Sequence, residues 1–317
     1  MSLAYFTLYY ANSAQEFLRL ERLATGGTVI QYNRMRISVI IPTLNAGASL
    51  EKLISMLLLQ DNPPLEIIII DSSSSDNTVD IAKGCGAKTI RIPRQAFNHG
   101  KTRNHAAMEA EGDVLVFMTQ DAMPMNNTFL RTLTAPLTVP DIAATFGRHI
   151  PGPDASAPEK FARYFNYPDK GSVKGMEDIK KYGIKTFFSS NVCSAMKKEL
   201  FIKAGKFHEG VRLNEDMLIT AKFILNGYKV AYVPEAMVIH SHNYSLLKQF
   251  MRYYNIGASI KKNKWILEYT QAEGEGIKFV REQILFVMRQ QKYLWIPYIL
   301  LEAATKFAGY RIGLIAG

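Results

Sequence analysis

The segments Arg36-Ile-Ser-Val-Ile-Ile-Pro-Thr-Leu-Asn45 and Leu65-Glu-Ile-Ile-Ile-Ile-Asp-Ser-Ser-Ser-Ser-Asp-Asn-Thr78 decide the fold. In each segment, a short and almost wholly apolar run is followed by small polar residues. Runs without polar alternation are typical of strands that are covered on both faces, as in a parallel sheet with crossover helices. Between the two runs, the apolar residues of 49–60 recur at helical spacing, which predicts the crossover helix.

The same alternation of helix and strand continues along the chain. It predicts a short helix over 77–83, a strand over 89–92, a helix over 100–110 and a strand over 114–118. This order predicts a doubly wound α/β domain, with a Rossmann-like and mainly parallel sheet that carries helices on both faces. Ligands bind such sheets outside the carboxyl ends of the strands. The polar segments 43–45, 71–75 and 119–122 fall at those ends.

Composition limits the partners of the protein. The chain has 317 residues and a formal net charge of +10, and its positive excess is prominent after Ser245. The first part of the chain has no cluster of Lys and Arg with interleaved aromatic residues, and no zinc-finger or basic-zipper spacing occurs. No nucleic-acid partner is therefore expected. The charge favours an anionic substrate or a membrane surface instead.

The motifs at the strand ends resemble those of a known family. Residues 39–45 and 70–78, together with Asp121 and the pair Glu215-Asp216, are similar to the motifs of family-two glycosyltransferases, which have the GT-A fold. Within that family, bacterial rhamnosyltransferases that build cell-surface polysaccharides are the most similar, through residues 97–104, 118–121, 165–168 and 240–244. The resemblance implies an inverting transfer of rhamnose from dTDP-rhamnose to a growing, lipid-linked glycan.

The resemblance gives the catalytic role to Asp216, with Glu215 beside it, and makes Asp216 the base that accepts the acceptor's proton. By its position, Asp216 lies at the start of an apolar helix that ends at Asn226-Gly227. A helix N-terminus favours the ionised carboxylate, which a base requires. The alternative is simple capping of that helix by Asn214 or Asp216.

The donor site is expected to combine the strand ends with the start of the helix over 100–110. By resemblance, Asp71 accepts a hydrogen bond from the pyrimidine base, while the backbone donors of the helix start favour the diphosphate. A turn-forming role for Asp71 and a solvated helix face are the alternatives. The expected donor-binding residues are Pro42, Thr43, Asn45, Asp71, Ser73, Asn98, His99, Lys101, Arg103, Gln120 and Asp121.

A divalent metal, Mg²⁺ or Mn²⁺, is the expected cofactor, because a departing diphosphate needs a metal ion or cationic donors to offset its charge. The family has an acidic triplet with aspartate at both ends, whereas this chain has Thr119-Gln120-Asp121. Asp121 is thus the first candidate ligand. His240 and His242 are the others, because alternation along a strand would point both to the same side. A turn-capping aspartate and packed histidines are the alternatives.

These patterns divide the chain into three regions. They are a leader of unclear role over 1–35, a GT-A domain over 36–245 with a nucleotide-binding half (36–125) and an acceptor half (126–245), and a basic, amphipathic helical region over 246–317. A different donor such as a UDP-hexose and a non-catalytic GT-A-like binding protein are alternative functions. A nucleotidyltransferase is disfavoured because 42–47 is not a Gly-rich phosphate loop.

The last region predicts attachment to a membrane surface. Ile277, Val280, Ile284 and Val287 recur near helical spacing, which is typical of an interfacial helix over 277–290. The aromatic residues that follow, between 293 and 298, suit the headgroup level. The expectation is a cytoplasmic enzyme bound peripherally to the inner face of the membrane. The alternative is a helical pair packed on the catalytic domain, or on a second subunit in a homodimer.

Overall fold

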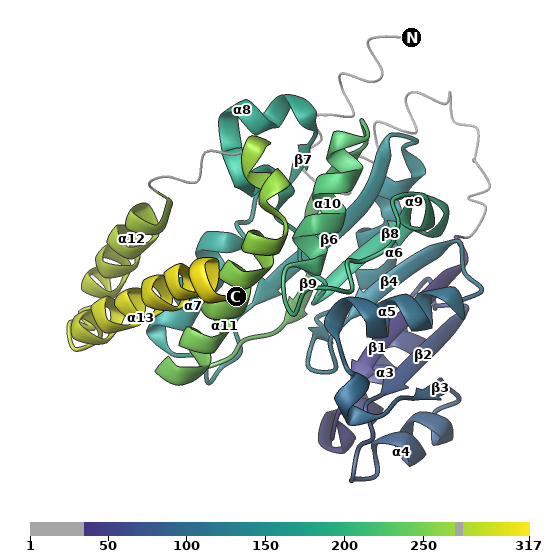
Figure 1. Ribbon diagram of the computed structural model, residues 1–317. Helices are drawn as coiled ribbons and strands as arrows, with labels where there is room; N and C mark the ends of the chain where they lie inside the picture. The colour runs from purple at the N-terminus through teal and green to yellow at the C-terminus, as the bar shows by residue number, and fades with distance from the viewer. Residues whose placement is uncertain (1–34, 270–274) are drawn as a thin grey trace, which may run out of the picture.

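The computed structural model describes residues 35–269 and 275–317, so almost all of the expected leader lies outside it (Figure 1). Within these residues one nine-stranded sheet has the order β3-β2-β1-β4-β8-β6-β9-β5, and β7 pairs with β9. The strands are β1 (Ile37–Thr43), β2 (Glu66–Asp71), β3 (Lys88–Arg91), β4 (Val114–Met118), β5 (Met123–Pro124), β6 (Ile142–Ile150), β7 (Ser172–Lys174), β8 (Cys193–Lys197) and β9 (Lys229–Ile239). The helices are α3 (Gly47–Leu58), α4 (Thr78–Gly84), α5 (His99–Met108), α6 (Phe129–Thr134), α7 (Ala157–Asn166), α8 (Ile179–Tyr182), α9 (Lys198–Lys203), α10 (Glu215–Leu225), α11 (Leu246–Lys262), α12 (Glu275–Arg289) and α13 (Trp295–Ala316).

The first half of the sheet is the predicted doubly wound unit. β1 pairs in parallel with β2 and β4, and β2 pairs in parallel with β3. The crossovers are α3, α4 and α5, so the elements predicted over 37–118 are confirmed with small shifts at their ends. Thr43 lies opposite Asp71 in the register. The polar segments of β1 and β2 therefore meet at one edge of the sheet, as predicted.

The second half of the sheet is mixed. β8 runs antiparallel between β4 and β6, whereas β9 is parallel to β6. β5 pairs antiparallel with the end of β9, with Met123 opposite Ile239. Since Asp121 precedes β5 by two residues and His240 follows β9 directly, this pairing brings two distant parts of the sequence together.

Alternate residues along the buried strands point into two cores, one on each face of the sheet. On one face, Ile40 and Phe117 pack with residues of α5 and α10, and Figure 1 shows these helices in front of the sheet. On the other face, Val39 and Val116 pack with residues of α3 and α6. Helices cover both faces, which explains why the strand sequences lack polar alternation.

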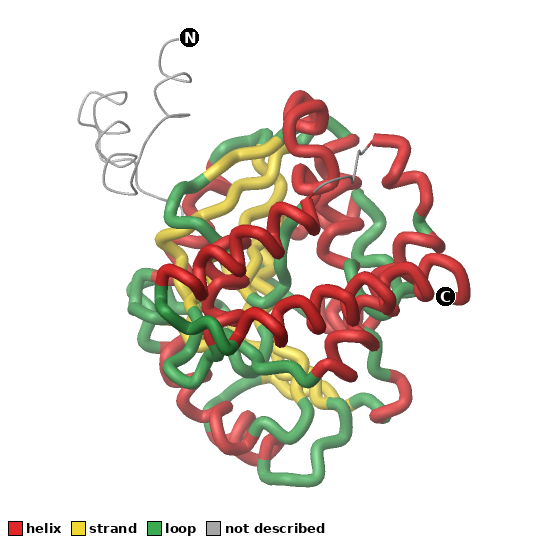
Figure 2. The backbone as a smooth tube through the Cα atoms, turned by 90° about the vertical axis from the view of Figure 1, so that its left-hand side faces the viewer, coloured by secondary structure: helices red, strands yellow, loops and turns green. Residues whose placement is uncertain are grey.

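The region after Ser245 forms three helices beside the sheet, which Figure 2 shows from the side. α11 and α13 cross closely because glycines lie at their contact. A methyl group on Gly313 would meet the backbone of Tyr254, and one on Gly309 would meet the backbone of Phe250. α12 packs against α7 and α13. Among the described residues, no helix is both long enough and apolar enough to cross a membrane.

The prediction that the apolar face of 277–290 lies at a membrane interface is wrong for most of that face. Val287 is fully buried, and Val280 and Ile284 pack against the same small cluster, which includes Ile299 of α13. Only Ile277 of the four apolar residues is largely exposed. The apolar stripe of α12 therefore faces the protein, as in the alternative of helices packed on the catalytic domain.

Candidate active site

The carboxyl ends of β1 and β2 are joined by buried side chains. Asp71 has no exposed surface, and its carboxylate accepts hydrogen bonds from the Thr43 hydroxyl (3.0 Å), the Ser74 backbone N–H (2.8 Å) and the Ser74 hydroxyl (2.5 Å). Asn45 lies in the left-handed region, at φ 50°, and its Oδ1 accepts from the Ser75 N–H (2.9 Å). These bonds fix the loop shapes. Direct contacts of Asp71, Thr43 and Asn45 with a nucleotide stay predictions.

Gln120 connects the end of β4 to the same loops. Its amide accepts from the Leu44 N–H (2.8 Å) and donates to the Leu44 carbonyl (3.2 Å). The hydroxyl of Ser73 donates to the Ile92 carbonyl (2.9 Å), and Pro42 lies half-buried in β1. All three predicted segments thus meet at one edge, where hydrogen bonds between them position their side chains.

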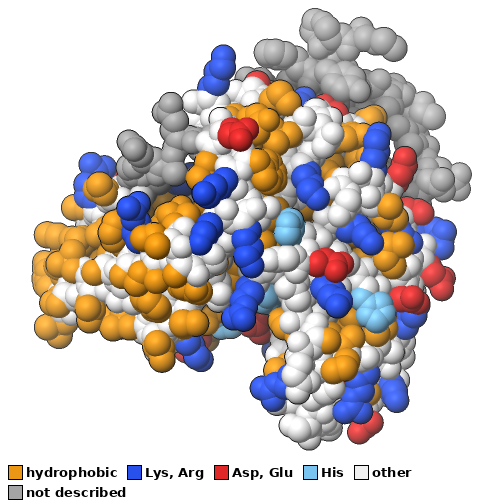
Figure 3. Space-filling model, viewed as in Figure 1, with side chains coloured by type: hydrophobic (Ala, Val, Ile, Leu, Met, Phe, Trp, Pro, Cys, Tyr) orange, Lys and Arg blue, Asp and Glu red, His pale blue; other side chains and the backbone are white. Residues whose placement is uncertain are grey.

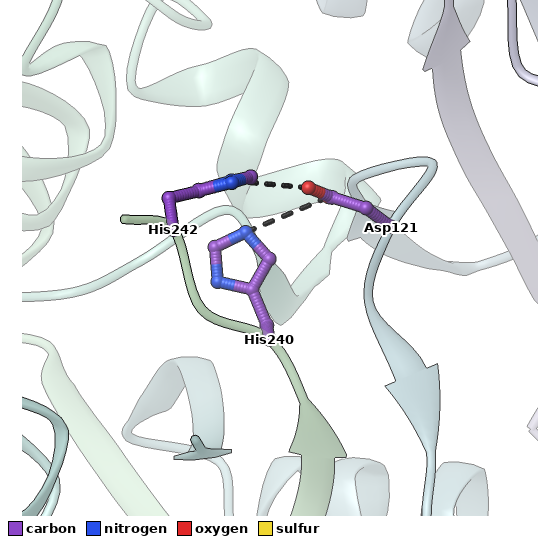
Figure 4. A group of neighbouring side chains, drawn as sticks. All are labelled: Asp121, His240 and His242. Atoms are coloured by element: carbon purple, nitrogen blue, oxygen red, sulfur yellow. Dashed lines mark ion pairs between the residues drawn. The ribbon is translucent and has the colours of Figure 1, made fainter. Parts of the chain in front are cut away.

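Asp121, His240 and His242 form a compact cluster (Figure 4). His240 Nε2 lies 3.5 Å from Asp121 Oδ1, and His242 Nε2 lies 3.0 Å from Asp121 Oδ2. The three potential ligand atoms all lie within 4.8 Å of one another. The predicted juxtaposition of these residues is confirmed, and both histidines point toward the carboxylate.

The electrostatics of this cluster suit a cation. Burial lowers the pKa of His240 to about 4 against the opposing effect of Asp121, so its ring is neutral and keeps a free lone pair. For Asp121, burial acts to raise the pKa, but the hydrogen bond from His242 and the positive charge that His240 carries at the low pH where Asp121 titrates hold it well below its ordinary value. Two imidazole nitrogens and one carboxylate are a donor set that fits a divalent transition metal, Mn²⁺ better than Mg²⁺.

The predicted catalytic pair begins α10. Glu215 is buried, and its Oε1 accepts from Arg103 Nη1 (3.3 Å) and Asn191 Nδ2 (3.2 Å). Asp216 is half-buried, and its Oδ1 accepts from the Met217 N–H (2.8 Å). The side chain of Asn214 makes no capping hydrogen bond.

The pKa of Asp216 differs from the expectation. Burial, and then the negative charge of Glu215, raise the pKa of Asp216 to about 7, although Arg103 and the Met217 N–H act in the opposite direction. The helix N-terminus was expected to favour the ionised form, and it is outweighed because the carboxylate is desolvated beside a second one. A pKa near neutrality still suits a general base, because it is close to the working pH.

Arg103 of α5 does not lie where a diphosphate contact was predicted. Arg103 is 3% exposed and donates to the His99 carbonyl (3.1 Å) as well as to Glu215. It therefore positions Glu215 instead of reaching an open surface. Asn98 caps α5 by accepting from the Lys101 N–H (2.9 Å) and also donates to the Val211 carbonyl (2.8 Å). Lys101 remains exposed, and its contact with a diphosphate stays a prediction.

Aromatic rings pack next to the His/Asp cluster. Tyr167 stacks on His149 with ring centroids 3.8 Å apart, and His149 meets His240 edge-on at 5.4 Å. Asp216 lies near enough to Tyr167 to contribute to the raised pKa of its hydroxyl. The sequence offered no motif for His149, because it lies inside a strand with no distinctive spacing.

Residues 38–205 match the family described as Glycosyl transferase family 2. The chain belongs to this family. Two Salmonella proteins are similar over most of their length: O-antigen chain rhamnosyltransferase RfbN of Salmonella typhimurium (41% identity over 88% of this chain and 90% of that one), and rhamnosyltransferase WbaN of Salmonella anatum (41% identity, 87% and 88%).

Solved structures agree with the fold of this glycosyltransferase. The mannosyltransferase PcManGT of Pyrobaculum calidifontis, in complex with GDP-Man and Mn²⁺, aligns with a TM-score of 0.55 at 18% identity, covering 90% of this chain and 77% of that one. Staphylococcus aureus TarS 1-349 in complex with UDP-GlcNAc aligns with a TM-score of 0.56 at 18% identity, covering 88% and 90%. At this identity the two structures bear on the fold alone, which is the predicted GT-A arrangement.

Sequence reasoning missed Arg252 of α11. This exposed side chain lies over the ring of Tyr244, 6.0 Å from its centroid, and Tyr244 stacks on His242 at 5.0 Å. Burial lowers the pKa of both His99 and His240, and the charge of Arg252 adds to this effect. In this glycosyltransferase, α11 thus brings a positive charge close to the His/Asp cluster. In the sequence, Arg252 is one of several basic residues after Ser245, and no pattern sets it apart from the others.

Several aromatic residues of 161–188 belong to the core. Phe187 has no exposed surface, and Phe161 and Tyr167 are buried. Ser189 supports the catalytic helix instead, by donating to the Asp216 carbonyl (3.1 Å).

Proposed function

We propose that this glycosyltransferase moves L-rhamnose from dTDP-rhamnose to a growing, lipid-linked surface polysaccharide, with inversion at the anomeric carbon. The two Salmonella relatives support the sugar, because both are O-antigen chain rhamnosyltransferases at 41% identity over most of the chain. The observation that carries the reaction is the first turn of α10, where Asp216, with a pKa of about 7, lies beside the buried Glu215 and acts on Tyr167, whose ring stacks on His149 next to the His/Asp cluster.

In the proposed mechanism, Asp216 accepts the proton of the acceptor hydroxyl as that oxygen attacks the anomeric carbon. The C–O bond to the diphosphate breaks in the same displacement, and the electron pair leaves with dTDP. Glu215, which is paired with Arg103, keeps the proton affinity of Asp216 high. No covalent enzyme intermediate is needed, which agrees with a single carboxylate base.

The residues that would hold a divalent metal are Asp121, His240 and His242, and we propose Mn²⁺ as the ion. Bound there, it would supply a positive charge that stabilises the departing diphosphate. Lys101 and Arg252 are exposed cations that we assign to the same anion, since Lys101 lies at the start of α5 and the charge of Arg252 acts on His99 and His240. The buried Asp71 and Thr43 keep the loop for the nucleotide in shape.

The experiment that tests this function is a donor screen. The purified protein is given dTDP-rhamnose, UDP-glucose, UDP-GlcNAc or GDP-mannose, with Mn²⁺ and a lipid-linked acceptor fraction, and nucleotide release is measured. We expect dTDP-rhamnose to give the highest kcat/KM. A clear preference for a UDP-hexose would select the alternative donor, and no turnover of any donor would support the non-catalytic alternative.

We also propose that the enzyme binds an anionic membrane surface through α13. The outward side of this helix is mainly apolar, with Arg311 as an exposed cation, and Leu294 just before it is 95% exposed. Figure 3 shows hydrophobic side chains gathered over α12 and α13. Arg289, Lys292 and Arg311 are exposed beside them. The α13 stripe consists of Leu294, Leu300, Leu301, Phe307, Ile312 and Ile315.

Sedimentation with phosphatidylglycerol vesicles tests this attachment. Wild-type protein should sediment at low salt, and a variant with Leu300, Phe307 and Ile315 changed to Gln should stay in the supernatant, because apolar burial and basic side chains both contribute to interfacial binding. Leu59→Gln, which changes an exposed leucine far from α13, is the matched control and should sediment. Equal behaviour of wild type and the triple variant would contradict the proposal.

A further inference from the structure

A pocket lies beside the His/Asp cluster, between α7, the loop after β9 and the C-terminal helices. Its volume is about 290 Å³. It is lined by Glu159, His242, Gln249, Trp295, Tyr298 and Glu302, among others. Since His242 belongs both to the pocket wall and to the cluster with Asp121, the pocket opens next to the centre of the proposed reaction.

The charged residues of the pocket are paired within the described chain. Glu159 forms an ion pair with Arg163 (2.6 Å), and Glu302 forms one with Lys306 (3.2 Å). Gln249 also donates to Glu302 Oε1 (2.9 Å). Because these charges are neutralised locally, the pocket offers no free cation to a phosphate group. A neutral ligand fits its electrostatics better than an anionic one.

The walls of the pocket combine aromatic rings with polar groups. Trp295 and Tyr298 meet edge-on with ring centroids 5.5 Å apart. Tyr244, in the loop after β9, also lines the pocket. Ser156, Ser245 and Gln249 supply hydroxyl and amide groups. Aromatic faces beside several hydrogen-bonding groups suit a ring with an apolar face and polar edges. A pyranose has this character.

We infer that this pocket binds a neutral pyranose unit of the acceptor glycan, next to the unit that receives the new sugar. The inference rests on the proposed function, which places the reacting acceptor beside the same cluster. The volume is close to the lower limit of about 300 Å³ for small-molecule sites, so it suits one sugar ring better than an extended chain. The α13 stripe lies on the other side of the helix that carries Trp295 and Glu302, so one helix would face both the membrane and the acceptor.

Intrinsic fluorescence tests the inference, because the chain has only two tryptophans, Trp265 and Trp295. Trp265 packs against the main core, away from the lining residues of the pocket. The variant Trp265→Phe leaves Trp295 as the reporter, and Trp295→Phe leaves Trp265. Each is titrated with the methyl glycosides of glucose, galactose, mannose, rhamnose and N-acetylglucosamine.

We expect at least one glycoside to change the Trp295 signal saturably, with a Kd on the order of millimolar, and to leave the Trp265 signal unchanged. Adding Tyr298→Ala to the Trp265→Phe background should raise that Kd roughly 3- to 10-fold, since one ring contact is lost. Tyr269→Ala, an exposed tyrosine outside the pocket, is the matched control and should leave the Kd unchanged.

The inference is overturned if no glycoside changes the Trp295 signal, or if both tryptophans respond alike. Hydrolysis of dTDP-rhamnose without acceptor, measured on the wild-type protein, separates this failure from that of the proposed function. Hydrolysis without a Trp295 response would overturn the pocket assignment alone. A Trp295 response without turnover of any nucleotide sugar would overturn the proposed function and leave a saccharide site.

Discussion

The strand ends of the first half-sheet and the helices after Ser245 contribute to the same site in opposite ways. At the strand ends, hydrogen bonds between the neighbouring loops after β1, β2 and β4 hold Asp71, Thr43 and Gln120 in place. In the C-terminal helices, Arg252 and Trp295 reach the site only through the packing of whole helices on one another. The proposed nucleotide side is therefore built by local hydrogen bonds, whereas the proposed acceptor side depends on the docking of helices.

The proposed base, Asp216 in the first turn of α10, gives the largest expected effect. Asp216→Asn should keep donor binding and lower the transfer rate by about 10²- to 10⁴-fold, because the base is lost. Transfer by Asp216→Asn at the wild-type rate would leave Asp216 with a structural role only. Nucleotide affinity, measured by calorimetry with dTDP, is the control that separates loss of chemistry from loss of the strand-end site.

The same substitution should stabilise the protein at high pH. The pKa of Asp216 is raised in the folded state, so its contribution to stability is present below its unfolded pKa and is lost as the pH rises through about 7. Asn carries no charge. The melting temperature of Asp216→Asn should therefore exceed that of wild type by a few degrees at pH 8 and should match it near pH 4. A lower melting temperature at pH 8 would contradict the raised pKa.

The His/Asp cluster joins the two regions, because Asp121 follows β4 and the histidines follow β9. Asp121→Ala should lower transfer by roughly 10²-fold, since metal ions contribute several kcal/mol of charge stabilisation. Excess chelator should lower wild-type activity by a similar factor, and added Mn²⁺ should restore it better than Mg²⁺. Full activity in chelator would remove the metal from the mechanism and leave Lys101 and Arg252 to meet the diphosphate.

A pH profile sharpens the role of the base. Below about pH 7, Asp216 is protonated in a growing fraction of molecules, so kcat/KM should fall by about tenfold for each pH unit. The rates are measured at substrate concentrations below KM. As a control, the affinity for dTDP should stay constant over the same pH range. A profile that stays flat down to pH 5 would assign the base to a group with an ordinary carboxylate pKa.

The smallest expected effect on chemistry tests docking on the acceptor side. Gly313→Ala places a methyl group against the Tyr254 backbone, so it should destabilise the contact of α11 with α13 by about 1 to 3 kcal/mol. Hydrogen exchange should then speed up in these two helices and stay unchanged in β1, β2 and β4. Gly276→Ala, whose methyl group would meet nothing within 4 Å, is the control. Faster exchange throughout the sheet would mean that the two regions are not independent.

The sequence predicted the locally built region well. The apolar runs of β1, β2 and β4 have no polar alternation, and the order of helices between them leaves few topologies. It also predicted that Asp121, His240 and His242 meet, although only by resemblance and strand alternation. The antiparallel insertion of β8 had no local signal, because strand direction is decided by long-range pairing.

Other parts of the site could not be predicted from patterns. Arg103 was expected at a diphosphate, and instead it is buried against Glu215, a contact between residues 112 positions apart. The pKa of Asp216 depends on that burial, which helix position alone does not reveal. The apolar stripe of α12 was expected at a membrane, but it packs on α7 and α13, and the exposed stripe belongs to α13.

The central claim is a single displacement in which Asp216 acts as base, and the stereochemistry of the first product tests it most directly. Proton NMR, recorded while the wild-type enzyme consumes dTDP-rhamnose with acceptor present, gives the anomeric configuration of the new linkage before any equilibration. The proposed mechanism predicts the configuration opposite to that of the donor, with no such signal from Asp216→Asn. A product that retains the donor's configuration would contradict it.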